Sequence, residues 1–195
     1  MGYGNLDIPI QRGSTYYNGR TIDTNDLAPS QKIVGQIRTF NDVNPTTMVT
    51  NSNLPVTCIL LRNKHSVALT PGQAIRFSTT VDGESGAPCD AATQLFAIVD
   101  EYLPAAGVPV NDLFWAVIGG PCTANMVTVA GAKTAGQLAV GPSTTAGKLD
   151  FTSLTPGNAT VAQQNATYGV NAFTEGAIAD AATTARVIIN RSFFG

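Results

Sequence analysis

The densest run of hydrophobic positions in the chain is Leu113 to Ile118, an unbroken apolar stretch that contains the only tryptophan, Trp115. Gly119-Gly120-Pro121 follows this run directly. A short apolar run bounded by Gly and Pro is typical of a strand that is buried on both faces. The pattern therefore predicts a central strand over Leu113 to Ile118 that is stopped at Gly119-Gly120-Pro121.

Shorter apolar stretches on both sides of this run alternate with polar residues, which indicates strands with one buried face. These predicted strands cover 33–40, 54–63, 67–69, 74–79, 94–99, 126–130 and 185–193. Loops rich in Gly, Pro and Asn are expected over 41–45, 82–92 and 131–147. Residues 160–168 are expected to form either a short helix or an exposed strand.

Many short strands at close spacing favour a mainly β fold, a small β-barrel or β-sandwich with at most one or two short helices. No repeat of fixed period is visible, and no linker divides two folded parts. We therefore expect residues 31–195 to form a single β-rich domain.

Residues 1–30 show no sustained hydrophobic period, so this segment cannot bury itself. Its isolated apolar residues are suited to anchoring an extended arm on a neighbouring molecule. The predicted partner-binding residues of this arm are Tyr3, Leu6, Ile8, Ile10, Tyr16 and Tyr17. The alternative is a terminus without a partner, since termini are often poorly ordered.

The composition limits the classes of molecule that the chain is expected to bind. Only 12% of the residues are charged, against about 25% in an average globular protein, and such a surface suits contacts between subunits. The formal net charge of −2 leaves no basic patch for nucleic acid. No apolar run approaches the roughly 20 residues that span a bilayer, and the first residues lack the pattern of a secretory signal.

The residues that usually carry chemistry are scarce. His65 is the only histidine and lies in a predicted turn, and Cys58, Cys89 and Cys122 form no CxxC pair. We expect three buried reduced thiols, with one disulfide and one free thiol as the alternative. Asp100 and Glu101 are adjacent, and would point to opposite faces if the strand continued through them. The sequence thus predicts no catalytic residue, cofactor or metal site, and no enzymatic activity.

Several stretches of the chain resemble a group of tailed-bacteriophage structural proteins, the capsid decoration or cement proteins. They read G-Q-I-R-T-F-N-D-V-N-P at 35–45, V-T-C-I at 56–59, L-R-N at 61–63, V-D-E at 99–101, A-G-V-P-V-N-D-L-F-W at 106–115 and G-P at 120–121. The similarity covers roughly residues 33–195 and contains no catalytic signature.

The resemblance implies a small, mostly β protein on the outside of an assembled icosahedral head, often as a homotrimer, which cements neighbouring subunits of the major capsid protein. Its expected location is therefore the capsid surface of the virion. Two alternatives stay open: a tail-tube or other virion structural component, and a carbohydrate-binding β module. An exposed Trp115 would favour the carbohydrate-binding alternative.

Overall fold

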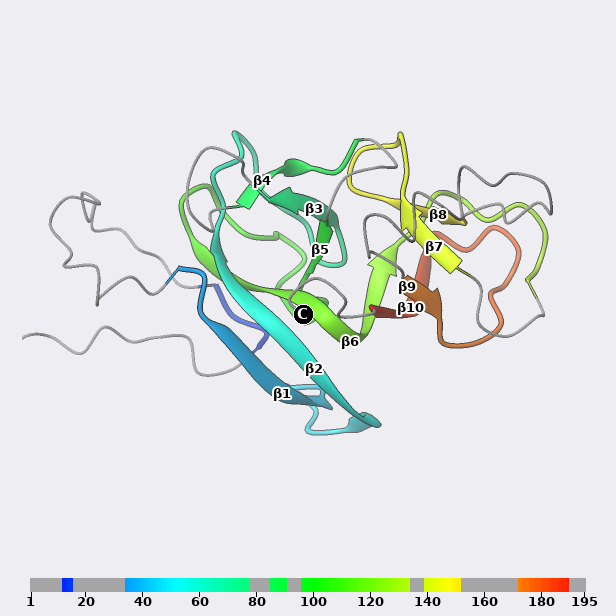
Figure 1. The fold of residues 1–195 in the computed structure, drawn as a ribbon, viewed down its shortest axis with the longest axis horizontal. Coiled ribbons are helices and arrows are strands. Elements are labelled where there is room, and N and C mark those ends of the chain that lie inside the picture. The colour runs from blue at the N-terminus through cyan, green and yellow to red at the C-terminus, as the bar shows by residue number, and fades with distance from the viewer. Residues whose placement is uncertain are drawn as a thin grey trace, which may run out of the picture.

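The computed structural model describes residues 12–15, 34–77, 85–90, 96–133, 139–151 and 172–189 (Figure 1). These residues form strands and no helix, so the predicted mainly β fold class is confirmed. The strands are β1 Ile37–Val43, β2 Thr50–Arg62, β3 Ala74–Phe77, β4 Ser85–Pro88, β5 Phe96–Val99, β6 Leu113–Asn125, β7 Ala139–Pro142, β8 Leu149–Phe151, β9 Ala172–Thr174 and β10 Thr184–Ile189. None of the described residues belongs to a helix long and apolar enough to cross a membrane.

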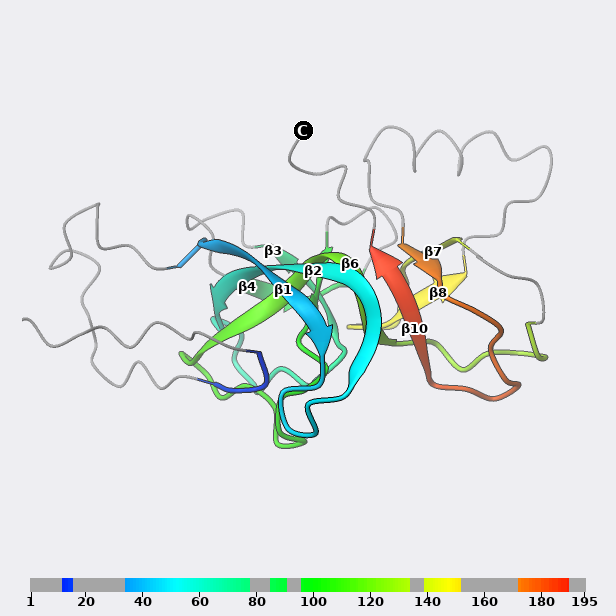
Figure 2. The ribbon, with the colours of Figure 1, turned by 90° about the horizontal axis from the view of Figure 1, so that it is seen from below.

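The strands form one sheet in the order β4-β3-β5-β6-β10-β9-β7-β8, and β2 pairs with both β1 and β6. Every ladder between these strands is antiparallel. The sheet is strongly curled, and the β1–β2 hairpin lies on one side of it (Figure 2). β6 joins the two ends of the sheet. Its first part pairs with β2 and β5, and its second part pairs with β10.

Both faces of the central strands are buried. On β6, Leu113, Trp115 and Val117 belong to one hydrophobic cluster, while Phe114 and Ala116 belong to a second. Successive side chains of a strand point to opposite faces, so an unbroken apolar run supplies both clusters at once. Trp115 is fully buried and packs edge-on against Phe40, with ring centroids 5.2 Å apart. The predicted buried central strand is confirmed.

The predicted end of this strand at Gly119 is wrong. β6 continues through Gly119-Gly120-Pro121 to Asn125, and these residues mark the point where its partner changes. β2 pairs with β6 up to Gly119, and β10 pairs with it from Gly120 onwards. Gly120 has a φ of +86°, and a Cβ atom there would lie 2.1 Å from the carbonyl oxygen of Pro55. Gly is therefore needed for a bend and a close approach inside the strand, not to end it.

Other boundaries also differ from the sequence predictions. The expected loop over 82–92 contains β4, whose backbone pairs with β3. Residues 126–130, expected as a strand, contribute only a bridge at Met126, and the expected strand 67–69 contributes only a bridge at Leu69. β1 runs on to Val43, into the expected loop 41–45. Whether such short segments form strands depends on pairing partners that are distant in the sequence. The segment 160–168 lies outside the described residues.

The three cysteines are free and buried, as expected. Burial raises the pKa of Cys89 to about 12, and it raises the pKa of Cys122 well above its ordinary value. These thiols are therefore protonated at neutral pH and pack as small apolar groups.

We predict that Gly120→Ala destabilises the fold far more than Gly131→Ala. Both glycines have positive φ, but nothing lies within 4 Å of a Cβ atom at Gly131. Gly131→Ala should cost about 1 kcal/mol of unfolding free energy through its φ angle alone, whereas Gly120→Ala should cost about 3 kcal/mol or more, because β2 must also move. Urea unfolding measures both, and equal losses would contradict the proposed role of Gly120.

Candidate functional site

The residues predicted to bind a partner, Tyr3, Leu6, Ile8, Ile10, Tyr16 and Tyr17, lie outside the described residues. Residues 12–15 of the predicted arm, which lie in sequence between Ile10 and Tyr16, are described by the structure. This short segment docks on the β domain, and we call its binding place the arm clamp. The arm clamp consists of Arg12, Gly13 and Thr15 together with Asp100, Glu101, Tyr102 and Asp112.

Arg12 is the centre of the arm clamp. Its side chain is 2% exposed, and its Nη2 atom lies 2.8 Å from Oδ1 of Asp100, which is fully buried. Its Nε donates a hydrogen bond of 3.0 Å to the same oxygen. The guanidinium group also lies over the ring of Tyr102, 4.7 Å from its centroid. Arginine suits this place because its planar group can pair with a carboxylate and stack on an aromatic ring together.

The neighbours of Arg12 add to the attachment. The backbone N–H of Gly13 donates to Oδ2 of Asp100 at 2.7 Å. The Thr15 side chain hydrogen-bonds Asp112, which follows a turn and directly precedes β6. Both oxygens of the Asp100 carboxylate thus accept hydrogen bonds from the arm. This carboxylate therefore binds residues 12–13 through a defined geometry.

Asp100 and Glu101 both contact Arg12, since the strand does not continue through them. β5 ends at Val99, and the chain turns through the next residues. Alternation between opposite faces holds only within a strand. Glu101 Oε1 therefore lies 3.4 Å from Nη2 of Arg12, beside the shorter contact from Asp100.

The ion pairs extend from the arm clamp across the sheet. Arg186 of β10 contacts Glu101 at 3.3 Å and Glu175 at 2.8 Å, and its Nη2 donates to Oδ2 of Asp42 on β1. We call this set of Arg12, Arg186, Asp42, Asp100, Glu101 and Glu175 the ion network. It ties the arm, β1, the turn after β5, the end of β9 and β10 together.

Burial and charge oppose each other in the arm clamp. Burial raises the pKa of Asp100, while Arg12 and the Gly13 N–H act against this rise by stabilising the carboxylate. Burial also disfavours the charge of Arg12, but Asp100 and Glu101 outweigh it and hold the pKa of the guanidinium above its ordinary value. The arm therefore keeps its positive charge when it is docked.

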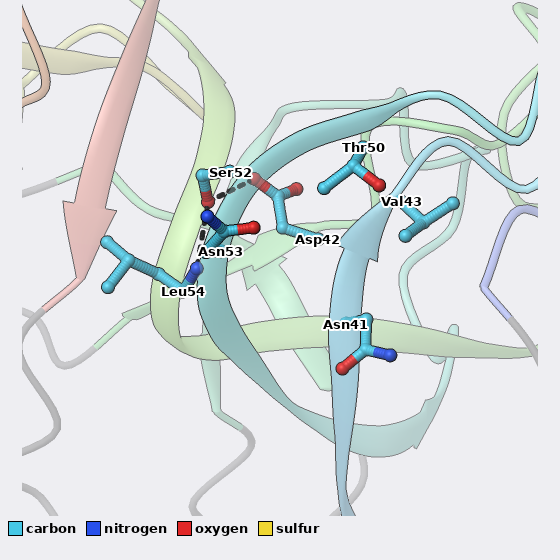
Figure 3. Close-up of a pocket in the computed structure, with 7 residues that line it drawn as sticks. All are labelled: Asn41, Asp42, Val43, Thr50, Ser52, Asn53 and Leu54. Atoms are coloured by element: carbon cyan, nitrogen blue, oxygen red, sulfur yellow. Dashed lines mark hydrogen bonds between the residues drawn. The ribbon is translucent and has the colours of Figure 1, made fainter.

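Asp42, at the far end of the ion network, also lines a pocket in the β1–β2 hairpin (Figure 3). The pocket has a volume of about 280 Å³ and is lined by Asn41, Asp42, Val43, Thr50, Ser52, Asn53 and Leu54. The Ser52 hydroxyl donates to Oδ2 of Asp42 at 2.7 Å. The other oxygen, Oδ1, is buried and has no hydrogen-bond partner.

The tip of the same hairpin exposes apolar side chains on a well-defined turn. The Asn44 side chain accepts hydrogen bonds from the N–H groups of Thr46 and Thr47, and the N–H of Met48 donates to the Asn44 carbonyl at 2.8 Å. Met48 and Val49 are 75% and 57% exposed, and Leu54 is 46% exposed.

Comparison with known proteins does not assign the chain to a family. The chain matches no protein-family model and no curated protein sequence. Within the described part of the chain, no group of three or more His, Cys, Asp or Glu side chains is placed to hold a metal ion. His65 lies in a bend, as expected, and its N–H donates to the Asn63 side chain.

Sequence reasoning missed Arg12 and the pocket. Arg12 lies among Gly, Ser and Thr residues with no period around it, so nothing marks it as buried. The available signal was Asp100, which directly follows the apolar run 95–99. A carboxylate next to a buried strand needs a partner, which here comes from 88 residues earlier in the chain.

We predict that Arg12→Met lowers the unfolding free energy at pH 7 by about 3 kcal/mol, because it leaves the Asp100 carboxylate buried without its cation. Arg76→Met is the matched control, since Arg76 pairs with Asp90 at 3.6 Å on the surface and its loss should cost less than about 1 kcal/mol. Urea unfolding measures both. Loss of hydrogen-exchange protection at the Gly13 amide would show that the arm has left its clamp, and unchanged protection would contradict the clamp.

The cost of Arg12→Met should also increase with pH. The pKa of Asp100 is raised above its unfolded value of 3.8, so the stability that protonated Asp100 contributes is complete below that value and is lost as pH rises through the folded pKa. Arg12 holds this pKa down, so without Arg12 the loss continues to higher pH. The gap in unfolding free energy between the two proteins should widen as the pH rises above the unfolded pKa of 3.8. A gap that does not change with pH would contradict this role of Arg12.

Proposed function

We propose that this chain is a structural virion protein that binds the outside of an assembled phage capsid and cements neighbouring subunits of the major capsid protein. The observation that supports this proposal is the arm clamp, in which Arg12 fixes the middle of an otherwise unpatterned N-terminal segment to the domain. A cement protein has to hold two molecules at a defined distance, and a clamped arm provides a defined starting point for the second contact.

The predicted anchors lie within short reach of this point. Ile10 precedes Arg12 by two residues and Tyr17 follows it by five, while Tyr3 precedes it by nine. At roughly 3.3–3.6 Å per extended residue, Tyr3 reaches at most about 30 Å from Arg12. That distance is enough to cross from one small domain to the next. The clamp therefore restricts the anchors to nearest neighbours.

β1 offers a place for such an arm. Among the described strands it pairs only with β2, so no described strand occupies its other edge. An extended segment can add to a sheet edge through main-chain hydrogen bonds, which need little from its sequence. Arms exchanged between three copies in this manner would form the proposed homotrimer.

The alternatives differ in measurable ways. A carbohydrate-binding module usually displays aromatic rings, but Trp115 is fully buried and packs against Phe40, so this residue offers no ligand platform. A tail-tube component remains the structural alternative. It would assemble as a hexameric ring, and native mass measurement separates a hexamer from a trimer.

We predict that purified particles of the virus that encodes this chain contain it in a fixed, high ratio to the major capsid protein. Protein added to shells that lack it should co-sediment with them, while Ile8→Asp/Ile10→Asp protein should keep its unfolding midpoint and lose binding. Thr128→Asp, an exposed substitution on the domain, is the control and should bind normally. Absence of the chain from purified particles would end the proposal.

A further inference from the structure

We propose that the β1–β2 pocket binds the ammonium group of a lysine side chain presented by the docking partner; naming the capsid as that partner rests on the proposed function. The pocket lining contains the hydroxyl groups of Thr50 and Ser52, the amides of Asn41 and Asn53, and one charged residue, Asp42. No basic residue is part of this lining. The lining is therefore rich in oxygen acceptors around a single negative charge.

The environment of Asp42 leaves one acceptor open. Its side chain is fully buried, and Oδ2 already accepts from Ser52 and Arg186. Oδ1 has no hydrogen-bond partner, and a buried polar atom without a partner is costly. Figure 3 shows the carboxyl group between Ser52 and Thr50. Oδ1 is therefore the acceptor of this lining that still needs a donor.

The wider charge balance also favours a cation. The ion network contains two arginines, Arg12 and Arg186, and four carboxylates, Asp42, Asp100, Glu101 and Glu175. With every group ionised, two positive and four negative charges leave an excess of two negative charges. Asp42 is the member of the ion network that lines the pocket. A positive charge from a partner at this place would offset part of the negative excess.

The arrangement of acceptors selects an ammonium group over other cations. A guanidinium group binds a carboxylate best through two parallel hydrogen bonds, and Arg186 and Ser52 already occupy Oδ2 of Asp42. A calcium ion needs six to eight oxygen ligands and usually several carboxylates, but this lining has one. An ammonium group is compact and has three donors, which suit one carboxylate oxygen and two neutral oxygens.

The rim of the pocket suits the rest of a lysine side chain. Leu54 and Val43 line the pocket, and exposed Val49 and Met48 follow at the hairpin tip. The four-carbon stem of lysine packs on such apolar surface while its charged end reaches an acceptor. Apolar contacts around a buried charge pair exclude water and strengthen it. The hairpin therefore combines a charged centre with an apolar rim.

The test is a titration of the purified chain with butylammonium, followed through the backbone amide resonances of residues 50–54. We expect saturable shifts with butylammonium and none with butanol or butylguanidinium at equal concentration. Asp42→Asn should weaken binding at least about tenfold, as expected for loss of a charged hydrogen-bond acceptor. Asp90→Asn, at an exposed aspartate, should leave binding unchanged.

Asp42 also pairs with Arg186, so urea unfolding of Asp42→Asn is measured first to show that the variant is folded. Thr50→Lys is the second variant, since Thr50 is exposed and its replacement places a tethered ammonium group in the pocket. It should abolish the butylammonium shifts, whereas Thr46→Lys, on the exposed turn outside the pocket, should keep them. Equal shifts in wild type and Thr50→Lys would overturn the inference.

Binding to shells separates this inference from the proposed function. If wild-type protein binds shells and acetylation of the shell lysines abolishes binding, both are supported. Shell binding that survives acetylation and Thr50→Lys would overturn the lysine pocket and leave the cement function standing. Saturable butylammonium shifts without any shell binding would support the pocket and contradict the cement function.

Discussion

The pairing of β6 is the constraint on which the described structure depends. This strand runs from Leu113 to Asn125 and pairs with β2, β5 and β10. Its side chains contribute to both hydrophobic clusters, so each part of the sheet is positioned relative to the same backbone. Gly120 makes this possible, because only a residue without a Cβ atom can meet the Pro55 carbonyl where one partner strand replaces another.

The ion network joins elements that the sheet leaves apart. It connects Arg12 of the arm with Glu101 after β5 and with Arg186 of β10. β5 pairs with the first part of β6 and β10 with its second part, so the network joins elements from both ends of that strand. Buried ion pairs add little net stability, because desolvation offsets their attraction. Their geometric demands are strict, however, and a carboxylate such as Asp100 accepts only a partner that fits its position. The network therefore specifies where the arm attaches more than it stabilises the fold.

The hairpin pocket and the arm clamp are two ends of one charged system. Asp100 has both oxygens occupied by the arm, whereas Asp42 has one oxygen occupied and one open. The first is a closed contact within the chain, and the second is suited to a contact with another molecule. In the proposed lysine contact, a partner's positive charge would extend the same set of charges that holds the arm at the other end.

The sequence by itself determined the fold class and the central strand. Six consecutive apolar residues around Trp115 require burial on both faces, and this demand is local, so it can be read without knowing any partner. It did not determine that β6 passes through Gly119-Gly120-Pro121, because the bend is stabilised by β2 and β10, which are distant in the sequence. Nor did it reveal the site. Arg12 becomes a buried residue, and Asp42 an acceptor with one open oxygen, only when folding brings together charges that no periodic pattern relates. Hydrophobic burial follows from each residue's own character, but ion pairing depends on distances between residues, and only the tertiary structure sets those distances.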